Sequence, residues 1–367
     1  MKIFARKVYT GSTVLHDQII ETQHGKITRI VSGLPTDGVK TIACIAPGFV
    51  DIHINGGSKY HFTKQPNTET IEDISSSSSL QGTAYTLPTL ITSPFENINA
   101  GTEAIRNYKL AFAASGVLGM HLEGPFIHPK KRGAHLLNFI RKPTDKDIEQ
   151  ITSYSDAIRL LTIAPELFST SQLKKLLDSG IKISAGHSNA SYKEAMQAFD
   201  NGVTLVTHMY NAMSSFMHRE PGLVGAVLDS PHVYAPIILD GLHCDYAAAR
   251  IAWNAKGEKL FLISDALFVD RKVKSFQWEG FDSELKSNAY YNSEGNLSGA
   301  AISLAEAVRN AVNQVGIPLK DAIEMASIRP AIALGIDDQV GKIEIGYPAR
   351  FTVFDEDLKS FEVVVCG

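Results

Sequence analysis

Five side chains that can bind a metal or move a proton each lie at, or just past, the end of a short apolar segment. They are His53, Glu123, His187, His208 and Asp265. Short apolar segments bounded by turn residues are typical of buried strands, and the carboxyl ends of all strands in a parallel (β/α)8 barrel meet at one face. This series restricts the fold more than any other feature. It predicts a parallel α/β barrel with a metal-dependent site where the strands end.

Eight strand segments alternate with helical segments, which is the pattern of βα units around a parallel sheet. The predicted strands are 48–54, 84–90, 117–123, 158–164, 181–185, 203–208, 236–240 and 260–265, and predicted helices include 69–80, 97–114, 171–179, 192–200 and 246–254. Eight units suit a TIM-type barrel better than an open sheet. The stretch 268–299 interrupts the alternation directly after Asp265, and we interpret it as an insertion that forms a lid over the site.

The two ends of the chain have β character. Segments 2–10, 17–23 and 26–31 predict strands near the N-terminus, and segments 350–355 and 361–365 predict strands near the C-terminus. We therefore expect one small β domain built from residues 1–46 and 346–367, with the barrel occupying residues 47–345.

Composition limits the class of protein. The chain has 367 residues, of which 44% are hydrophobic and 20% charged, as is ordinary for a globular protein. A net charge of −4 gives no support for binding to nucleic acid or to anionic membranes. No apolar segment is long enough to span a bilayer, and the charged N-terminus does not resemble a signal peptide. Three widely spaced cysteines, Cys44, Cys244 and Cys366, suggest no disulfide framework, so a cytoplasmic location is expected.

Glu123, His187 and His208 form a predicted ligand set. A lone glutamate at a strand end is usually an exposed loop residue, but here two histidines end later strands in the same way. Two imidazoles and one carboxylate leave a coordination position open, which is typical of catalytic zinc. We predict one divalent transition metal per chain. Zinc is the expected ion, and iron, cobalt or manganese suit the same ligands.

Asp265 has two interpretations. An aspartate after an apolar strand is most often the N-cap of the next helix. Near a metal-activated water, it is a general base that takes a proton and later returns it to the leaving amine. The accompanying metal ligands favour the second interpretation.

His53 and Asn55 share one face of the first predicted strand, because alternate residues of a strand point the same way. Histidine at both positions would make a strong second metal site, but an amide is a poor ligand for a transition metal. The pair is therefore a candidate for a second or a vestigial metal site.

Several longer motifs surround these residues. They are His-Leu-Glu-Gly-Pro at 121–125, Ser-Ala-Gly-His-Ser at 184–188, Thr-His-Met-Tyr-Asn-Ala-Met at 207–213, Arg-Glu-Pro-Gly-Leu at 219–223, Asp-Gly-Leu-His at 240–243 and Ser-Asp-Ala at 264–266. With these motifs the chain, from Pro47 to about Pro348, resembles the N-acetylglucosamine-6-phosphate deacetylases, a family of the amidohydrolase superfamily. The resemblance implies a distorted (β/α)8 barrel with a small β-sandwich domain formed by both chain termini.

The resemblance also implies roles at matching positions. Glu123, His187 and His208 would bind the metal, and Asp265 would be the general base and acid. The residues implied to contact substrate are Ala134, His135, Asn211, Ala212, Arg219 and His243. Among these, His135 would polarise the acetyl carbonyl, Asn211 and Ala212 would offer backbone N–H groups to the phosphate, and Arg219 and His243 would supply positive charge to it, one or both from a neighbouring subunit. Taken alone, Arg219 would be interpreted as a surface residue.

The chain departs from the family pattern at two places. Asn55 replaces the second histidine of the two-metal members, although His53 is kept. The run Leu297-Ser298-Gly299 keeps the family's motif, but alanines follow where hydroxyl residues are common.

The expected function is metal-dependent hydrolysis of N-acetylglucosamine 6-phosphate to glucosamine 6-phosphate and acetate. The expected enzyme is a cytoplasmic homodimer that binds a small amino sugar phosphate and neither nucleic acid nor membranes. One alternative is another amidohydrolase activity, such as deacetylation of another amino sugar phosphate, a dihydroorotase reaction or dipeptide cleavage. A second alternative is a barrel that binds sugar phosphate as a sensor without turnover.

Overall fold

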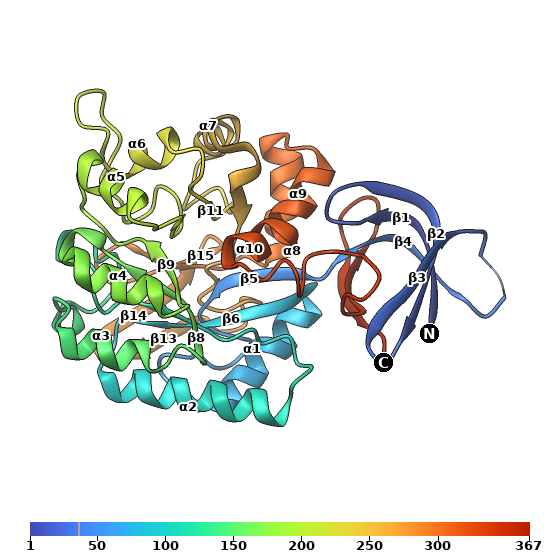
Figure 1. The fold of residues 1–367 in the computed structure, drawn as a ribbon, viewed down its shortest axis with the longest axis horizontal. Helices are drawn as coiled ribbons and strands as arrows, with labels where there is room; N and C mark the ends of the chain where they lie inside the picture. Colours follow the sequence, from blue (N-terminus) through green and yellow to red (C-terminus); the bar gives the residue numbers. More distant parts are fainter. Residues whose placement is uncertain (36) are drawn as a thin grey trace.

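Eight parallel strands follow one another in the computed structural model, which describes residues 1–35 and 37–367 (Figure 1). The strands are β5 (Phe49–Ile54), β6 (Thr83–Ile91), β7 (Met120–Glu123), β8 (Ile158–Ile163), β9 (Lys182–Ala185), β10 (Leu205–Val206), β11 (Ala235–Ile237) and β12 (Leu260–Leu262). β5 to β10 form one six-stranded sheet, and β11 pairs with β12. Single parallel bridges, Leu205 with Tyr234 and Ile54 with Ala266, join the two sheets at both sides. This arrangement is compatible with a distorted (β/α)8 barrel.

Each predicted barrel strand is present, but the later ones are shorter than expected. β5 and β6 are buried along their whole length, as is usual for strands covered on both faces. β10 and β12 end early because the chain turns sharply at His208 and at Asp265, where φ is +32° and +46°. A left-handed residue cannot continue a strand.

Helices cover the outside of the strands (Figure 1). They are α1 (Thr68–Leu80), α2 (Phe95–Ala111), α3 (Asp145–Thr152), α4 (Thr170–Asp178), α5 (Tyr192–Asp200), α6 (Gly222–Asp229), α7 (Tyr246–Lys256), α8 (Leu304–Asn310), α9 (Leu319–Ala326) and α10 (Ile328–Leu334). Capping boxes start α3, α4, α5 and α8, so local sequence defines where these helices begin. Within the described ranges, no helix has both the length and the apolar character needed to cross a membrane.

Both chain ends contribute to a separate sheet with its own hydrophobic core. Its strands are β1 (Lys2–Tyr9), β2 (Val14–Gln23), β3 (Lys26–Ser32), β4 (Lys40–Pro47), β17 (Arg350–Phe354) and β18 (Phe361–Val365), in the order β18-β17-β4-β1-β2-β3. The expected β-sandwich needs correction: β1 pairs with both β2 and β4, and this joins the six strands into one continuous sheet. Figure 1 shows this sheet beside the barrel, with both termini in it.

The stretch 268–299 forms a four-stranded antiparallel sheet, which we call the lid. Its strands are β13 (Ser275–Trp278), β14 (Phe281–Lys286), β15 (Ala289–Tyr291) and β16 (Leu297–Ala300). The lid returns to the barrel where it left it: Ala300 donates its backbone N–H to the Asp265 carbonyl over 2.9 Å and accepts from Leu267 over 2.9 Å. A bidentate ion pair between Arg132 and Glu294 ties the lid to the loop before His135.

Candidate metal centre and active site

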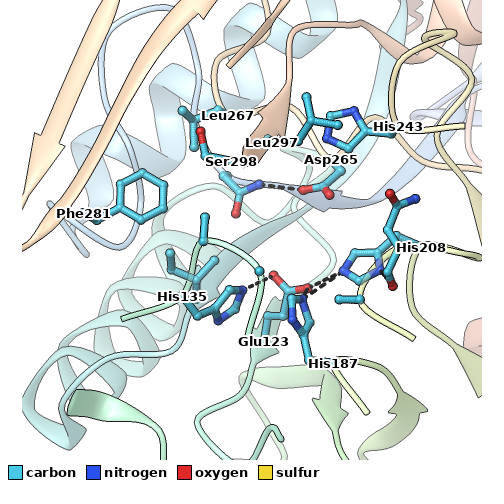
Figure 2. Close-up of a pocket in the computed structure, with 17 residues that line it drawn as sticks. Glu123, His135, His187, His208, His243, Asp265, Leu267, Phe281, Leu297 and Ser298 are labelled. Atoms are coloured by element: carbon cyan, nitrogen blue, oxygen red, sulfur yellow. Dashed lines mark hydrogen bonds and ion pairs between the residues drawn. The ribbon is translucent and has the colours of Figure 1, made fainter. Parts of the chain in front are cut away.

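One pocket lies at the carboxyl ends of the barrel strands, beneath the lid (Figure 2). Its empty volume, which includes space open to solvent, is about 650 Å³. The side chains and backbone that line it are Asn55, Ile91, Glu123, Gly133, Ala134, His135, His187, His208, Asn211, Ala212, His243, Asp265, Leu267, Phe281, Leu297, Ser298 and Gly299. The structure therefore brings together nearly every predicted site residue.

Glu123, His187 and His208 converge on one point of this pocket, and each is less than 5% exposed. Glu123 Oε1 lies 3.1 Å from Nε2 of both histidines, whose Nε2 atoms are 3.0 Å apart. The opposite ring nitrogens face backbone carbonyls: Nδ1 of His187 lies 2.8 Å from the Lys131 oxygen, and Nδ1 of His208 lies 3.0 Å from the Asn211 oxygen. A carbonyl only accepts, so Nδ1 carries the proton in each ring.

This hydrogen-bond pattern fits a bound cation. With Nδ1 protonated, each neutral ring points an Nε2 lone pair at the other ring and at a carboxylate oxygen. Three buried acceptors face one another with no donor among them, an arrangement that repels unless a positive ion lies between them. Two imidazoles with fixed tautomers and one carboxylate are ligands suited to a divalent transition metal.

His135 is an alternative third ligand. One ring nitrogen each from His135 and His187 and one carboxylate oxygen of Glu123 lie within 4.8 Å of one another, so these three could also hold a metal ion. However, His135 Nε2 lies 3.6 Å from Glu123 Oε2, the oxygen that faces away from the other two rings. His208 Nε2 makes the shorter contact with the carboxylate, 3.1 Å from Glu123 Oε1.

Thr92 and Gly124 position His135. The Thr92 hydroxyl, which donates to the Glu123 carbonyl over 3.2 Å, lies 2.7 Å from His135 Nδ1 and so fixes the orientation of the ring. Gly124, at φ +88°, directly follows Glu123, and a Cβ at this position would collide with the Thr92 hydroxyl. Glycine therefore allows the metal-ligand strand and the His135 support to lie side by side.

Asp265 lies across the pocket from Glu123 and His187, with its side chain mostly buried (Figure 2). Asn55 donates Nδ2–H to Asp265 Oδ1 over 3.0 Å, and His53 Nε2 lies 3.1 Å from the same oxygen and 3.3 Å from Glu123 Oε2. Burial would lower the pKa of His53, but Asp265 and Glu123 raise it to about 9. Because Asn55 and His53 both contact Oδ1, the other oxygen of Asp265, Oδ2, is left for other partners.

Several of these residues have unusual backbone conformations. His187, His208 and Asp265 have φ of +47°, +32° and +46°, and Ala212 has φ of +50°. For a non-glycine residue such a conformation costs roughly 1–3 kcal/mol of free energy, and it persists mainly where function requires it. The strain falls on the predicted metal and proton-transfer residues.

His243 lies near Leu297 and Asp265 in Figure 2, and Asn211 and Ala212 also line the pocket. Nδ1 of His243 lies 2.6 Å from Asp240 Oδ2, so its other nitrogen is left for the pocket. Burial raises the pKa of Asp240, but hydrogen bonds from His243 and backbone amides lower it overall. The Asp240 carboxylate, which also accepts the backbone N–H of His243 over 2.8 Å, thereby fixes the orientation of the His243 ring.

Arg219 does not line this pocket. It lies in an exposed loop and borders a separate groove beside α5. The backbone groups of Met217 and Glu220 bond to each other over 3.2 and 3.1 Å, so His218 and Arg219 occupy the tip of a tight turn. Figure 1 shows the loop before α6 projecting from the barrel.

Sequence analysis gave no functional role to the pocket residues Ile91, Leu267 and Phe281, or to Thr92, which contacts His135. Thr92 follows the end of β6, and its place at a strand end was an available signal. Phe281 had no comparable signal, because its position depends on how the lid folds back.

Comparison with known proteins agrees with this geometry. A sequence profile described as the amidohydrolase family matches residues 44–366. An N-acetylglucosamine-6-phosphate deacetylase of Haemophilus influenzae is 36% identical over 98% of this chain and 96% of its own. An N-acetylgalactosamine-6-phosphate deacetylase of Shewanella is 32% identical over 98% of this chain and 93% of its own.

A solved structure agrees as well. The crystal structure of N-acetylglucosamine-6-phosphate deacetylase from Pasteurella multocida superposes with a TM-score of 0.93 at 33% identity, covering 100% of this chain and 98% of that one. With a family match over most of the chain and whole-length relatives above 30% identity, this chain belongs to the amidohydrolase family.

Proposed function

We propose that this protein hydrolyses N-acetylglucosamine 6-phosphate to glucosamine 6-phosphate and acetate. The observation that carries the proposal is the convergence of Glu123, His187 and His208 opposite Asp265, in one pocket. The whole-length similarity to deacetylases of amino sugar phosphates supports the choice of substrate.

The three ligands would hold one metal ion, with zinc as the proposed ion. A bound metal supplies Lewis-acid chemistry, which polarises a carbonyl and lowers the pKa of water. Asn55 stands where a second imidazole would be needed, and its amide already donates to Asp265. An amide adds little to a transition-metal site, so the proposal is one tightly held ion per chain.

Asp265 and His135 have different roles in the proton transfers of the reaction. Asp265 takes a proton from the attacking water as the new C–O bond forms and gives it to the amide nitrogen as the C–N bond breaks. His135 donates its Nε2–H to the carbonyl oxygen as negative charge develops there. The products are acetate and the free amine of the sugar phosphate.

We also propose that the eight strands close into a distorted (β/α)8 barrel, and that the protein works in the cytoplasm. The bridges of β10 to the segment before β11 and of β5 to the segment after β12 support closure. The three cysteines are free and buried, which is consistent with a reducing compartment.

Phosphate binding is proposed to use two subunits of a homodimer. Asn211, Ala212 and His243 of one chain would face the phosphate, and Arg219 would reach it from the partner. Phe216 and Met217, beside Arg219, are 58% and 54% exposed, and apolar side chains at a projecting tip favour burial against another surface.

Replacing Arg219 with alanine should raise KM for the phosphorylated sugar about 10- to 100-fold, as expected from losing a charge-assisted hydrogen bond of about 1.5–3 kcal/mol. Hydrolysis of unphosphorylated N-acetylglucosamine should barely change. Steady-state kinetics on both sugars check this, with Arg6→Ala in the terminal sheet as a control that removes the same charge. An equal loss on both sugars would make Arg219 structural.

Mixing subunits tests whether Arg219 acts across the dimer. A dimer of one Arg219→Ala chain and one Asp265→Asn chain has one intact site only if Arg219 serves its partner. Refolding the two variants together should then restore turnover at low substrate concentration. If Arg219 served its own chain, neither site would be intact and the mixture would stay inactive.

The overall proposal is tested by assaying acetate release from a panel of acetylated sugar phosphates, with elemental analysis of the same preparation. The Shewanella relative makes N-acetylgalactosamine 6-phosphate the second candidate substrate. N-acetylglucosamine 6-phosphate is expected to give the highest kcat/KM. A metal-replete protein inactive on the whole panel would instead support a sensor.

A further inference from the structure

The two ends of the pocket differ in chemistry. His243, Asn211 and Ala212 line this pocket, and so do Ile91, Leu267 and Phe281, which belong to one apolar cluster. In Figure 2, Phe281 lies on the side of His135, and His243 lies on the opposite side, beyond Asp265. In this view Glu123, His187 and Asp265 lie between Phe281 and His243.

The apolar end is a packed wall. Ile91, Leu267 and Phe281 are 6%, 2% and 4% exposed and belong to one hydrophobic cluster, built from a barrel strand, the segment after Asp265 and the lid. Ala134 and Leu136, the neighbours of His135 in the chain, pack against this cluster. The wall therefore directly adjoins the residue proposed to bind the substrate carbonyl.

The direction of an amide substrate follows from its own geometry. This step rests on the proposed function. A secondary amide is planar and trans, so its acyl carbon chain and its sugar extend in opposite directions from the C–N bond. With the phosphate near His243 and the carbonyl oxygen near His135, the acyl chain points to the apolar wall.

We infer that Ile91, Ala134, Leu267 and Phe281 form an acyl subsite for a short aliphatic group, and that the Phe281 ring limits its length. A formyl or acetyl group fits in front of the ring. Longer acyl groups meet a wall of buried, well-packed atoms, which resists displacement. One methylene in such a pocket typically changes kcat/KM by about 10- to 200-fold.

The test is competition between N-acetyl- and N-butyryl-glucosamine 6-phosphate in one reaction vessel, with acetate and butyrate measured together. The product ratio gives the ratio of kcat/KM values, and it does not depend on how much of a variant is folded. The native enzyme should favour acetyl by about 100-fold or more, and Phe281→Ala should shift the ratio toward butyryl by about 10-fold or more. Phe281→Leu should give an intermediate shift.

Leu285→Ala is the matched control. Leu285 lies on β14 with Phe281, on the same face of the strand, and it packs against the same cluster without lining the pocket. This variant should slow both substrates equally.

Three results would contradict the acyl subsite: an unchanged ratio in Phe281→Ala, an equal shift in Leu285→Ala, or a native preference for butyryl. If the native protein hydrolysed neither substrate, the proposed function itself would fall. An active native enzyme with an unchanged Phe281→Ala ratio would refute only the acyl subsite.

Discussion

Replacing Asp265 with asparagine is expected to lower kcat by a factor of about 10² to 10⁴, the usual contribution of a positioned acid or base. The amide has nearly the same size and keeps most hydrogen bonds, but it cannot accept the proton of the attacking water. Because Asp265 is not among the three converging ligands, the variant should retain its metal. Single-turnover kinetics and elemental analysis on the same sample check both parts.

The value of kcat, in a variant whose melting temperature is unchanged, separates this role from a purely structural one. If Asp265 acted only as a cap, the asparagine, itself a good cap, would cost at most a few tenths of a kcal/mol and leave kcat near native. Near-native kcat would therefore refute the proton-transfer role. Loss of the metal would instead move Asp265 into the coordination shell.

Replacing Glu123 with glutamine is expected to empty the metal centre and abolish turnover. The native chain should hold about one equivalent of metal, whereas the variant offers a neutral amide where the site needs a charged oxygen. A metal that binds only the folded state stabilises it by about 2.7 kcal/mol at 100 times its Kd. A chelator should therefore lower the melting temperature of the native protein and leave that of Glu123→Gln unchanged.

Glu72→Gln is a suitable control, because Glu72 accepts a hydrogen bond from Tyr108 and does not line the pocket. It should bind metal normally. Two equivalents that resist dialysis in the native protein would overturn the single-metal proposal and return His53 to the ligand set. A Glu123→Gln protein with full metal content would remove Glu123 from it.

The predicted ligands and Asp265 converge in the pocket because strand ends are visible in a sequence and the barrel brings them together. Their backbone supports were not predictable in this way. The carbonyls of Lys131 and Asn211, which fix the tautomers of His187 and His208, are groups that every residue carries. Their role depends only on how the loops fold.

Other differences between prediction and structure have similar causes. β4 was not predicted, and its pairing with β1 and β17 turns the expected sandwich into one sheet. Arg219 belongs to a recognisable motif, but the turn that carries it points away from the pocket of its own chain. Sequence patterns indicate which element a residue occupies more reliably than the direction of a loop.

The lid leaves the barrel after Leu267 and returns at Ala300, and these two residues are hydrogen bonded to each other. Because the two ends of the lid are adjacent, an insertion of another length or shape could span the same two points without moving Asp265. The hydrolytic residues belong to the barrel, whereas Phe281 and the Leu-Ser-Gly run belong to the lid. An exchange of this segment can therefore alter the proposed acyl subsite while the hydrolytic residues stay in place.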